Sequence, residues 1–117
     1  MIHIEDVLIL KGTKGTDKIV ESLCSDHLNN IVFSYAAVPI QMLHNSVHVN
    51  ANKHKSLANF MTYMDISLDE FMEGGKHYDY LIIYTPDLPE ANIMDAVRDW
   101  LVEEELNIEQ VIVVCQP

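Results

Sequence analysis

A short run of apolar residues, Leu81–Tyr84, constrains the fold of this chain more than any other feature. The run shows no alternation of polar and apolar side chains, and it lies between Gly74–Gly75 and Thr85–Pro86. Such a run is typical of a strand buried on both faces, as in parallel sheets covered by helices. Proline has no N–H for the ladder, so Pro86 ends the strand. Because ligands of open α/β sheets bind beyond the carboxyl ends of the strands, segment 85–88 is the first place to search for a site.

The rest of the chain alternates between strand-like and helix-like patterns. Ser46 to His54 alternates polar and apolar residues, which predicts an exposed edge strand or an extended loop. Ser67 and Glu70 have the capping-box spacing, which predicts that one short helix ends before Ser67 and a second begins there. Strands that alternate with helices predict a three-layer α/β sandwich with a mostly parallel sheet, in a single domain over residues 1–117. Strands are expected over 6–10, 31–35, 46–54, 78–84 and 108–115, and helices over 16–28, 57–64, 67–73 and 90–105.

Composition restricts the classes of function. With 49% hydrophobic residues over 117 positions, the chain can fill a core, and no apolar run is long enough to cross a membrane. The amino end lacks the basic and apolar regions of a signal peptide, so a cytoplasmic protein without membrane contact is expected.

The net charge of −11 comes entirely from one half of the chain. Residues 1–64 balance to zero, whereas residues 65–117 hold thirteen acids against Lys76 and Arg98. Phosphate repulsion would oppose direct nucleic-acid binding by this half. The acids form either a solvated helix face or a surface for a basic partner.

Cysteine and histidine give weak signals for chemistry. Cys24 and Cys115 have no CxxC partner, which favours two buried free thiols over a disulfide or a nucleophile. His44, His48 and His54 fall on one side of an extended segment, but no cysteine or acid lies near them in the sequence. Surface histidines are therefore favoured over a metal site, and no metal is predicted.

A glycine-containing loop, residues 12–18, follows one predicted strand and opens a helix, which is where a phosphate-binding loop must lie. Such a loop needs glycines whose N–H groups converge on phosphate, a lysine, and a Ser or Thr that holds Mg²⁺. A surface turn that caps the helix is the alternative. The candidate ligand-binding residues at this end of the sheet are Gly12, Lys14, Gly15, Thr16, Lys18 and Thr85.

Three islands of the sequence resemble the ParA/MinD group of P-loop ATPases, whose loop is a deviant Walker A motif. Residues 78–86, Tyr-Asp-Tyr-Leu-Ile-Ile-Tyr-Thr-Pro, are similar to the Walker B region of that family. Residues 111–117 are similar to a strand that ends in a polar residue and proline, and residues 31–39 lie where the family has its second strand. The resemblance implies a P-loop NTPase-like fold, a nucleotide ligand and, because members often dimerise, a homodimer.

The departures from the family pattern fall on its catalytic positions, so the Walker A motif is degenerate. Tyr84 stands where the family has the Walker B aspartate that helps to hold Mg²⁺. Asp17 and Ile19 replace the glycine and the Ser/Thr around Lys18, and residues 35–37 lack the aspartate that orients water. Phosphoryl transfer relies on metal, positioning and charge stabilisation, so little hydrolysis is expected.

The sequence therefore predicts a pseudo-ATPase, a P-loop-like module that acts through protein–protein interaction and has no catalytic residues or required cofactor. One alternative is a sensor that binds ATP or another nucleotide without Mg²⁺-dependent hydrolysis, through backbone N–H groups and lysines. Another is an acidic antagonist of a basic nucleic-acid-binding protein, whose affinity would fall steeply with salt.

Overall fold

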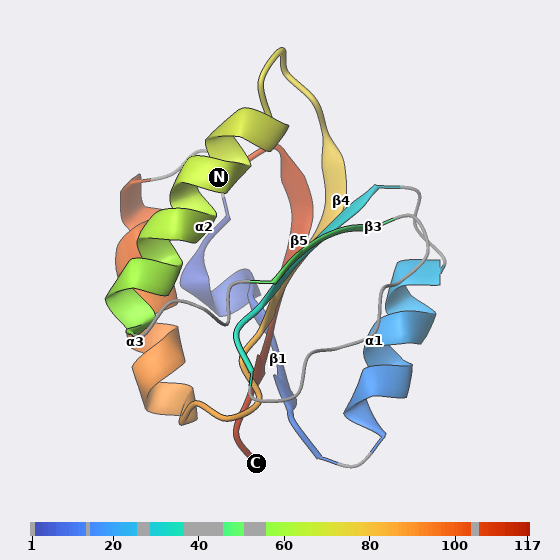
Figure 1. Ribbon diagram of the computed structural model, residues 1–117, viewed down its shortest axis with the longest axis vertical. Helices are drawn as coiled ribbons and strands as arrows, with labels where there is room; N and C mark the ends of the chain where they lie inside the picture. The colour runs from blue at the N-terminus through green and yellow to red at the C-terminus, as the bar shows by residue number, and fades with distance from the viewer. Residues whose placement is uncertain (1, 14, 26–28, 37–45, 51–55, 104–105) are drawn as a thin grey trace.

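The computed structural model describes residues 2–13, 15–25, 29–36, 46–50, 56–103 and 106–117. They form an α/β fold around a five-stranded sheet with the order β1-β5-β4-β2-β3, and every neighbouring pair of strands is parallel (Figure 1). The strands are β1 (Leu8–Lys11), β2 (Asn30–Ser34), β3 (Ser46–Asn50), β4 (Tyr78–Tyr84) and β5 (Ile108–Cys115). The helices are α1 (Thr16–Ser25), α2 (Leu57–Phe71) and α3 (Glu90–Glu103), and a 3-10 turn, η1 (Ile4–Asp6), precedes β1.

Helices cover both faces of the sheet, as Figure 1 shows, and each face has its own core. The α2/α3 face packs residues such as Phe33, Leu81 and Val113 against Phe60 and Ile93. The α1 face is smaller, and there Val20 of α1 packs against alternate residues of the same strands, Val32, Ile82, Tyr84, Ile112 and Val114. The predicted α/β class with a parallel sheet is confirmed.

Strand β4 is the centre of the sheet, with β5 on one side and β2 on the other. Its residues Leu81, Ile82 and Ile83 have no exposed surface, because helices cover both faces. The prediction of a strand buried on both faces is confirmed, and so is its end, because Pro86 lies just beyond Tyr84.

The two edge strands had different sequence patterns. Of the edge strand or extended loop predicted over 46–54, residues 46–50 form an edge strand, which among the described residues pairs with β2 alone, and residues 51–54 lie outside the described part of the chain. Strand β1 forms the opposite edge although its sequence has no polar alternation. Leu8 is 44% exposed and Ile9 is 38% exposed there. An unbroken apolar run does not by itself distinguish a central strand from an edge strand.

The prediction of two short helices over residues 57–73 is wrong, because α2 is one continuous helix. Its N-cap is Ser56, whose Oγ accepts a hydrogen bond from the N–H of Asn59 at 3.1 Å. Ser67, the expected cap, lies on the inner side of the helix and is 8% exposed. Ser67 and Leu68 continue the apolar stripe of Phe60 and Met64, and burial of this stripe overrides the local capping pattern.

Candidate functional site

Two of the predicted site residues, Gly12 and Thr85, flank the carboxyl end of β5, which separates β1 from β4. The N–H of Gly12, after β1, donates to the carbonyl of Cys115 at 2.6 Å. On the other side, the N–H of Thr85, after β4, donates to the carbonyl of Val114 at 2.9 Å. The end of β5 therefore brings the glycine loop and the Thr85 corner together, which sequence order alone does not show.

Gly12 also packs directly against Pro86. A Cβ atom at Gly12 would lie 2.8 Å from the Cβ of Pro86 and 3.0 Å from the carbonyl oxygen of Cys115. A glycine is required here because the backbones of two loops approach each other closely. The glycine of the loop thus contacts protein atoms at the place where a phosphate-binding glycine would contact its ligand.

Four backbone N–H groups of the glycine loop, those of Gly12, Thr13, Thr16 and Lys18, donate within the protein. The N–H of Thr13 donates to the carbonyl of Lys11 at 2.8 Å, and the N–H of Thr16 donates to the carbonyl of Thr13 at 3.1 Å. The N–H of Lys18 donates to the carbonyl of Gly15 at 3.1 Å. A phosphate cradle requires several such donors to converge on one empty point. In this conformation the bonded N–H groups point to carbonyls instead.

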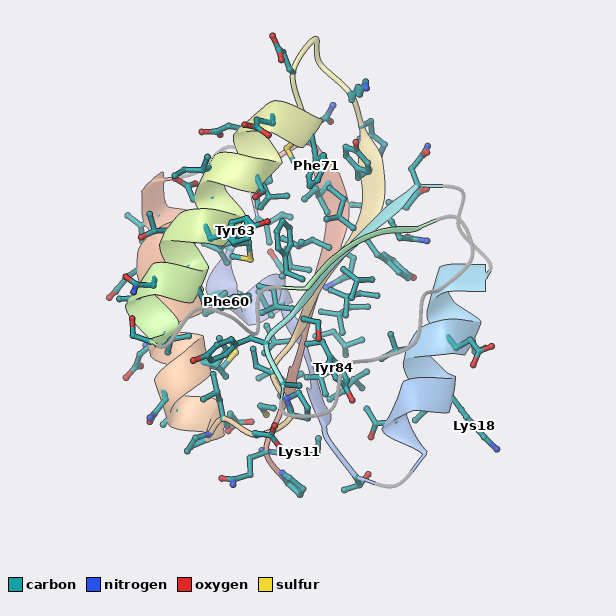
Figure 2. All side chains as sticks on the ribbon, viewed as in Figure 1. Lys11, Lys18, Phe60, Tyr63, Phe71 and Tyr84 are labelled. Carbon is teal, nitrogen blue, oxygen red and sulfur yellow. The ribbon has the colours of Figure 1, made fainter. Side chains whose placement is uncertain are left out.

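Two side-chain hydroxyls of the candidate residues also donate to carbonyls of the chain itself. The hydroxyl of Thr85 is fully buried and donates to the carbonyl of Val114 at 2.8 Å, and the hydroxyl of Thr16 donates to the carbonyl of Lys11 at 2.6 Å. Lys18 is exposed on α1, and Figure 2 shows its side chain directed away from the sheet. Gly15 has a φ of 96°, a conformation that favours glycine. Lys14 lies outside the described residues.

An ion pair beside this corner was missed by the sequence reasoning. The Nζ of Lys11 lies 3.0 Å from Oε1 of Glu90, the first residue of α3, and both side chains are about half exposed. Lys11 is also the register partner of Cys115 in the parallel pair of β1 and β5. The signal was absent from the sequence because no local pattern shows that β1 and β5 are neighbours.

This arrangement affects two pKa values in the same direction. The hydrogen bond to Glu90 raises the pKa of Lys11 above its ordinary value of 10.5. Burial raises the pKa of the Cys115 thiol above 9.0, and the nearby charge of Lys11 offsets only part of this effect. A protonated, buried thiol is a poor nucleophile. The prediction of a buried free thiol is confirmed for Cys115, whereas the side chain of Cys24 is not described.

Two polar side chains at the ends of β2 and β4 are also buried. Ser34 has no exposed surface, and its Oγ has no hydrogen-bond partner among the described residues. Its register neighbour on β4 is Tyr84, which is 6% exposed and packs in the core of the α1 face (Figure 2). The residue at the expected Walker B position is thus a tyrosine that packs in the core.

Metal binding finds no support in the part of the chain that the structure describes, where no three His, Cys, Asp or Glu side chains lie close enough to share an ion. The side chains of His44, His48 and His54 are outside that part, so the interpretation of them as surface histidines stays a prediction. None of the described helices combines the length and apolarity that a membrane crossing requires.

Comparison with known proteins gives no family for this chain: no family model, curated protein or solved structure matches it. The resemblance to ParA/MinD ATPases therefore stays a prediction made from residues 78–86 and the shorter islands.

Proposed function

We propose that this chain is a P-loop-like module that acts by binding another protein and does not turn over nucleotide. The observation that carries the proposal is the state of the loop after β1, where the N–H groups of Gly12, Thr13, Thr16 and Lys18 donate to carbonyls of the chain itself. The order of strand, glycine loop and helix supports the P-loop-like part of the proposal.

The side chains at the expected metal-binding positions support the absence of nucleotide turnover. Hydrolysis needs groups that hold a metal and neutralise charge at the transferred phosphoryl group. Tyr84 is packed among apolar side chains, and Ile19 is 51% exposed on α1, where the motif has a metal-binding hydroxyl. Neither side chain supplies the carboxylate or the Ser/Thr hydroxyl with which the motif holds Mg²⁺.

A basic partner is supported by the distribution of charge. The exposed acids of α2 and α3 lie on helices that cover the same face of the sheet (Figure 1). The one cation on these two helices, Arg98, is already paired with Asp95 at 3.0 Å. The exposed acids of this layer are Asp69, Glu70, Glu90, Asp95 and Asp99. We therefore place the partner surface on the α2/α3 layer.

ATP turnover by the purified chain tests the enzymatic part. We expect no Mg²⁺-dependent release of phosphate above that of the Lys18→Ala variant. Mg²⁺-dependent hydrolysis that Lys18→Ala abolishes would contradict the proposal.

Calorimetry separates the proposal from the nucleotide sensor. We expect no heat of binding with ATP, ADP or GTP at about 1 mM, a concentration that detects even weak sites. Binding that Lys18→Ala weakens but that needs no Mg²⁺ would favour the sensor. Affinity of a captured basic partner that falls steeply with salt would extend the proposal to the antagonist.

A further inference from the structure

The edge strand β1 presents an apolar, unpaired edge. Among the described strands its one neighbour is β5, and its side chains Leu8 and Ile9 are exposed. On the α2/α3 face a groove runs beside it, with the apolar side chains of Ile4, Ile9, Ala91 and Met94 and the charged side chains of Glu5, Glu90, Asp95 and Arg98. Natural edge strands are usually protected by charges, proline or a bulge, because an open edge pairs with other strands. The residues of β1 before Lys11 have none of these.

The unpaired backbone groups of β1 can be identified. The N–H of Gly12 faces β5, because it donates to Cys115. Successive residues of a strand direct their backbone groups to opposite sides, so Leu8 and Leu10 also face β5. Val7, which is extended, Ile9 and Lys11 therefore direct theirs away from the sheet.

Two of these outward groups are already bonded. The N–H of Val7 donates to the carbonyl of Ile4 at 3.2 Å. The carbonyl of Lys11 accepts from the hydroxyl of Thr16 and the N–H of Thr13. Among the described residues nothing bonds to the carbonyl of Val7, to either backbone group of Ile9 or to the N–H of Lys11. These groups form the open part of the edge.

We propose that β1 pairs antiparallel with β1 of a second copy of this chain, with Ile9 on the two-fold axis. In that register the two Ile9 residues exchange both of their N–H···O bonds. The next bonded position brings the N–H of Lys11 to the carbonyl of Val7 of the other copy. The carbonyl of Val7, both backbone groups of Ile9 and the N–H of Lys11 are then all hydrogen-bonded. The N–H of Val7 and the carbonyl of Lys11 gain no bond in this register, and both already have partners within their own chain.

The side chains agree with this register. Ile9 meets Ile9 of the other copy on the α2/α3 face, and Leu8 meets Leu10 on the α1 face, so exposed apolar side chains cover one another. A symmetric pair uses the same patch on both subunits and closes without forming a fibre. The result is a sheet that continues through the dimer.

Charge favours a second copy over a basic strand from another protein. The segment has Glu5 and Asp6 before its apolar residues and Lys11 after them. Antiparallel pairing brings the acids of one copy toward the lysine of the other, whereas parallel pairing would place like charges together. A uniformly basic strand of another protein would place a positive charge beside Lys11, and the two charges would repel each other. The pairing is independent of how the chain treats nucleotide.

Sedimentation equilibrium of the full chain from about 1 μM to about 1 mM tests the proposal. We expect a monomer–dimer equilibrium within that range. Ile9→Lys places two like charges opposite each other on the axis and should weaken association at least about tenfold. Ile66→Lys is the matched control, because Ile66 is 57% exposed on α2 and away from β1, and it should leave association unchanged. A monomer at the highest concentration would overturn the proposal and leave the edge open to a strand of another protein.

A charge exchange tests the antiparallel direction. Glu5→Lys and Lys11→Glu should each weaken self-association several-fold, roughly as loss of cross-strand charge pairs predicts. An equimolar mixture of the two variants should regain dimer, since positions 5 and 11 then carry opposite charges in both cross-strand contacts. If the weaker association came instead from loss of the intramolecular Lys11–Glu90 pair, mixing the two variants would not restore it. Failure of the mixture to associate better than either variant alone would overturn the antiparallel register.

Hydrogen exchange gives a residue-level readout. Protection of the Ile9 and Lys11 amides should rise with protein concentration, whereas the Leu8 and Leu10 amides, which face β5, should be protected at every concentration. A dimer whose Ile9 and Lys11 amides exchange as fast as in the monomer would use another surface and would overturn the proposal.

Discussion

At the scale of single residues, Gly12 shows how closely the segments at the carboxyl ends of the strands pack against one another. Its backbone contacts both Pro86 and the carbonyl of Cys115, so two loops and the end of β5 meet at a point with no room for a side chain. The predicted site is a place where the protein packs against itself.

Gly12→Ala should lower the free energy of unfolding by about 1–3 kcal/mol, because the added methyl group forces the loops apart. The neighbouring contact at 2.8 Å is with a rigid proline ring, which cannot rotate away. Urea unfolding of the variant and the parent measures the difference. An unchanged midpoint would show that the two loops separate easily and that the corner can open for a ligand.

Two buried hydroxyls should respond to removal in opposite ways. Thr85→Val loses the bond to the carbonyl of Val114 and should cost about 1 kcal/mol. Ser34→Ala removes an oxygen that has no partner among the described residues, and it should stabilise the protein by up to about 1 kcal/mol. Urea unfolding compares the two variants, each of which is the control for the other. Destabilisation of more than about 1 kcal/mol by Ser34→Ala would reveal a hydrogen bond at that hydroxyl.

At the scale of elements, α2 and α3 are joined by a polar contact within an apolar interface. The indole Nε1 of Trp100 donates to Oδ1 of Asp65 at 3.1 Å, and both side chains are half-buried. This bond fixes how the two helices lie against each other on the α2/α3 face.

A double-mutant cycle with Asp65→Ala and Trp100→Phe should give a coupling energy of about 1 kcal/mol, since the bond has a charged acceptor but is partly exposed to water. Urea unfolding of the parent, the two single variants and the double variant provides the cycle. Asp69→Ala is the matched control, because Asp69 is an exposed acid of the same helix, and its cycle with Trp100→Phe should show no coupling.

The elements differ in how far their sequences reveal them. The central strands β4 and β5 follow from hydrophobic runs, since burial on both faces leaves no polar residue in the run, and the end of β4 follows from Pro86. The division of α2 at Ser67 was wrong because a capping pattern is a local preference that burial of Phe60, Met64 and Leu68 outweighs. The edge position of β1 could not be predicted, because its residues are as apolar as those of β4.

At the scale of the whole molecule, the order of the strands decides the environment of the candidate site. No sequence pattern states that β5 lies between β1 and β4, so neither the Lys11–Cys115 register nor the contact of Gly12 with Pro86 could be foreseen. Gly12 and Thr85, two of the predicted site residues, lie on either side of the end of β5. The interpretation of this corner as a phosphate site stays a prediction.

The free energy of unfolding should fall as the pH rises into the alkaline range. The pKa of Cys115 is raised in the folded state, so the unfolded thiol loses its proton first and unfolding is favoured as the pH rises above 9.0. The raised pKa of Lys11 acts in the same direction at higher pH, because its stabilisation is present below 10.5 and is lost through the folded pKa. Urea midpoints between about pH 7 and about pH 10 measure the effect of the thiol.

The control for this prediction is Cys115→Ala, with Cys24→Ala as the common background so that one thiol titrates. The variant without Cys115 should lose stability less steeply between about pH 8 and about pH 10, the range in which an unfolded thiol ionises. Equal slopes with and without Cys115 would contradict the assignment of the alkaline effect to this thiol.

The position of β5 also has a consequence for synthesis. While the ribosome still covers residues 108–115, β4, β2 and β3 can already pair with one another, but β1 has no neighbour to bond with. Strand β1 must therefore wait for β5 before it joins the sheet, and such long-range pairing is slow to form. During that interval Leu8, Ile9 and Leu10 are open to chaperones and to other nascent chains.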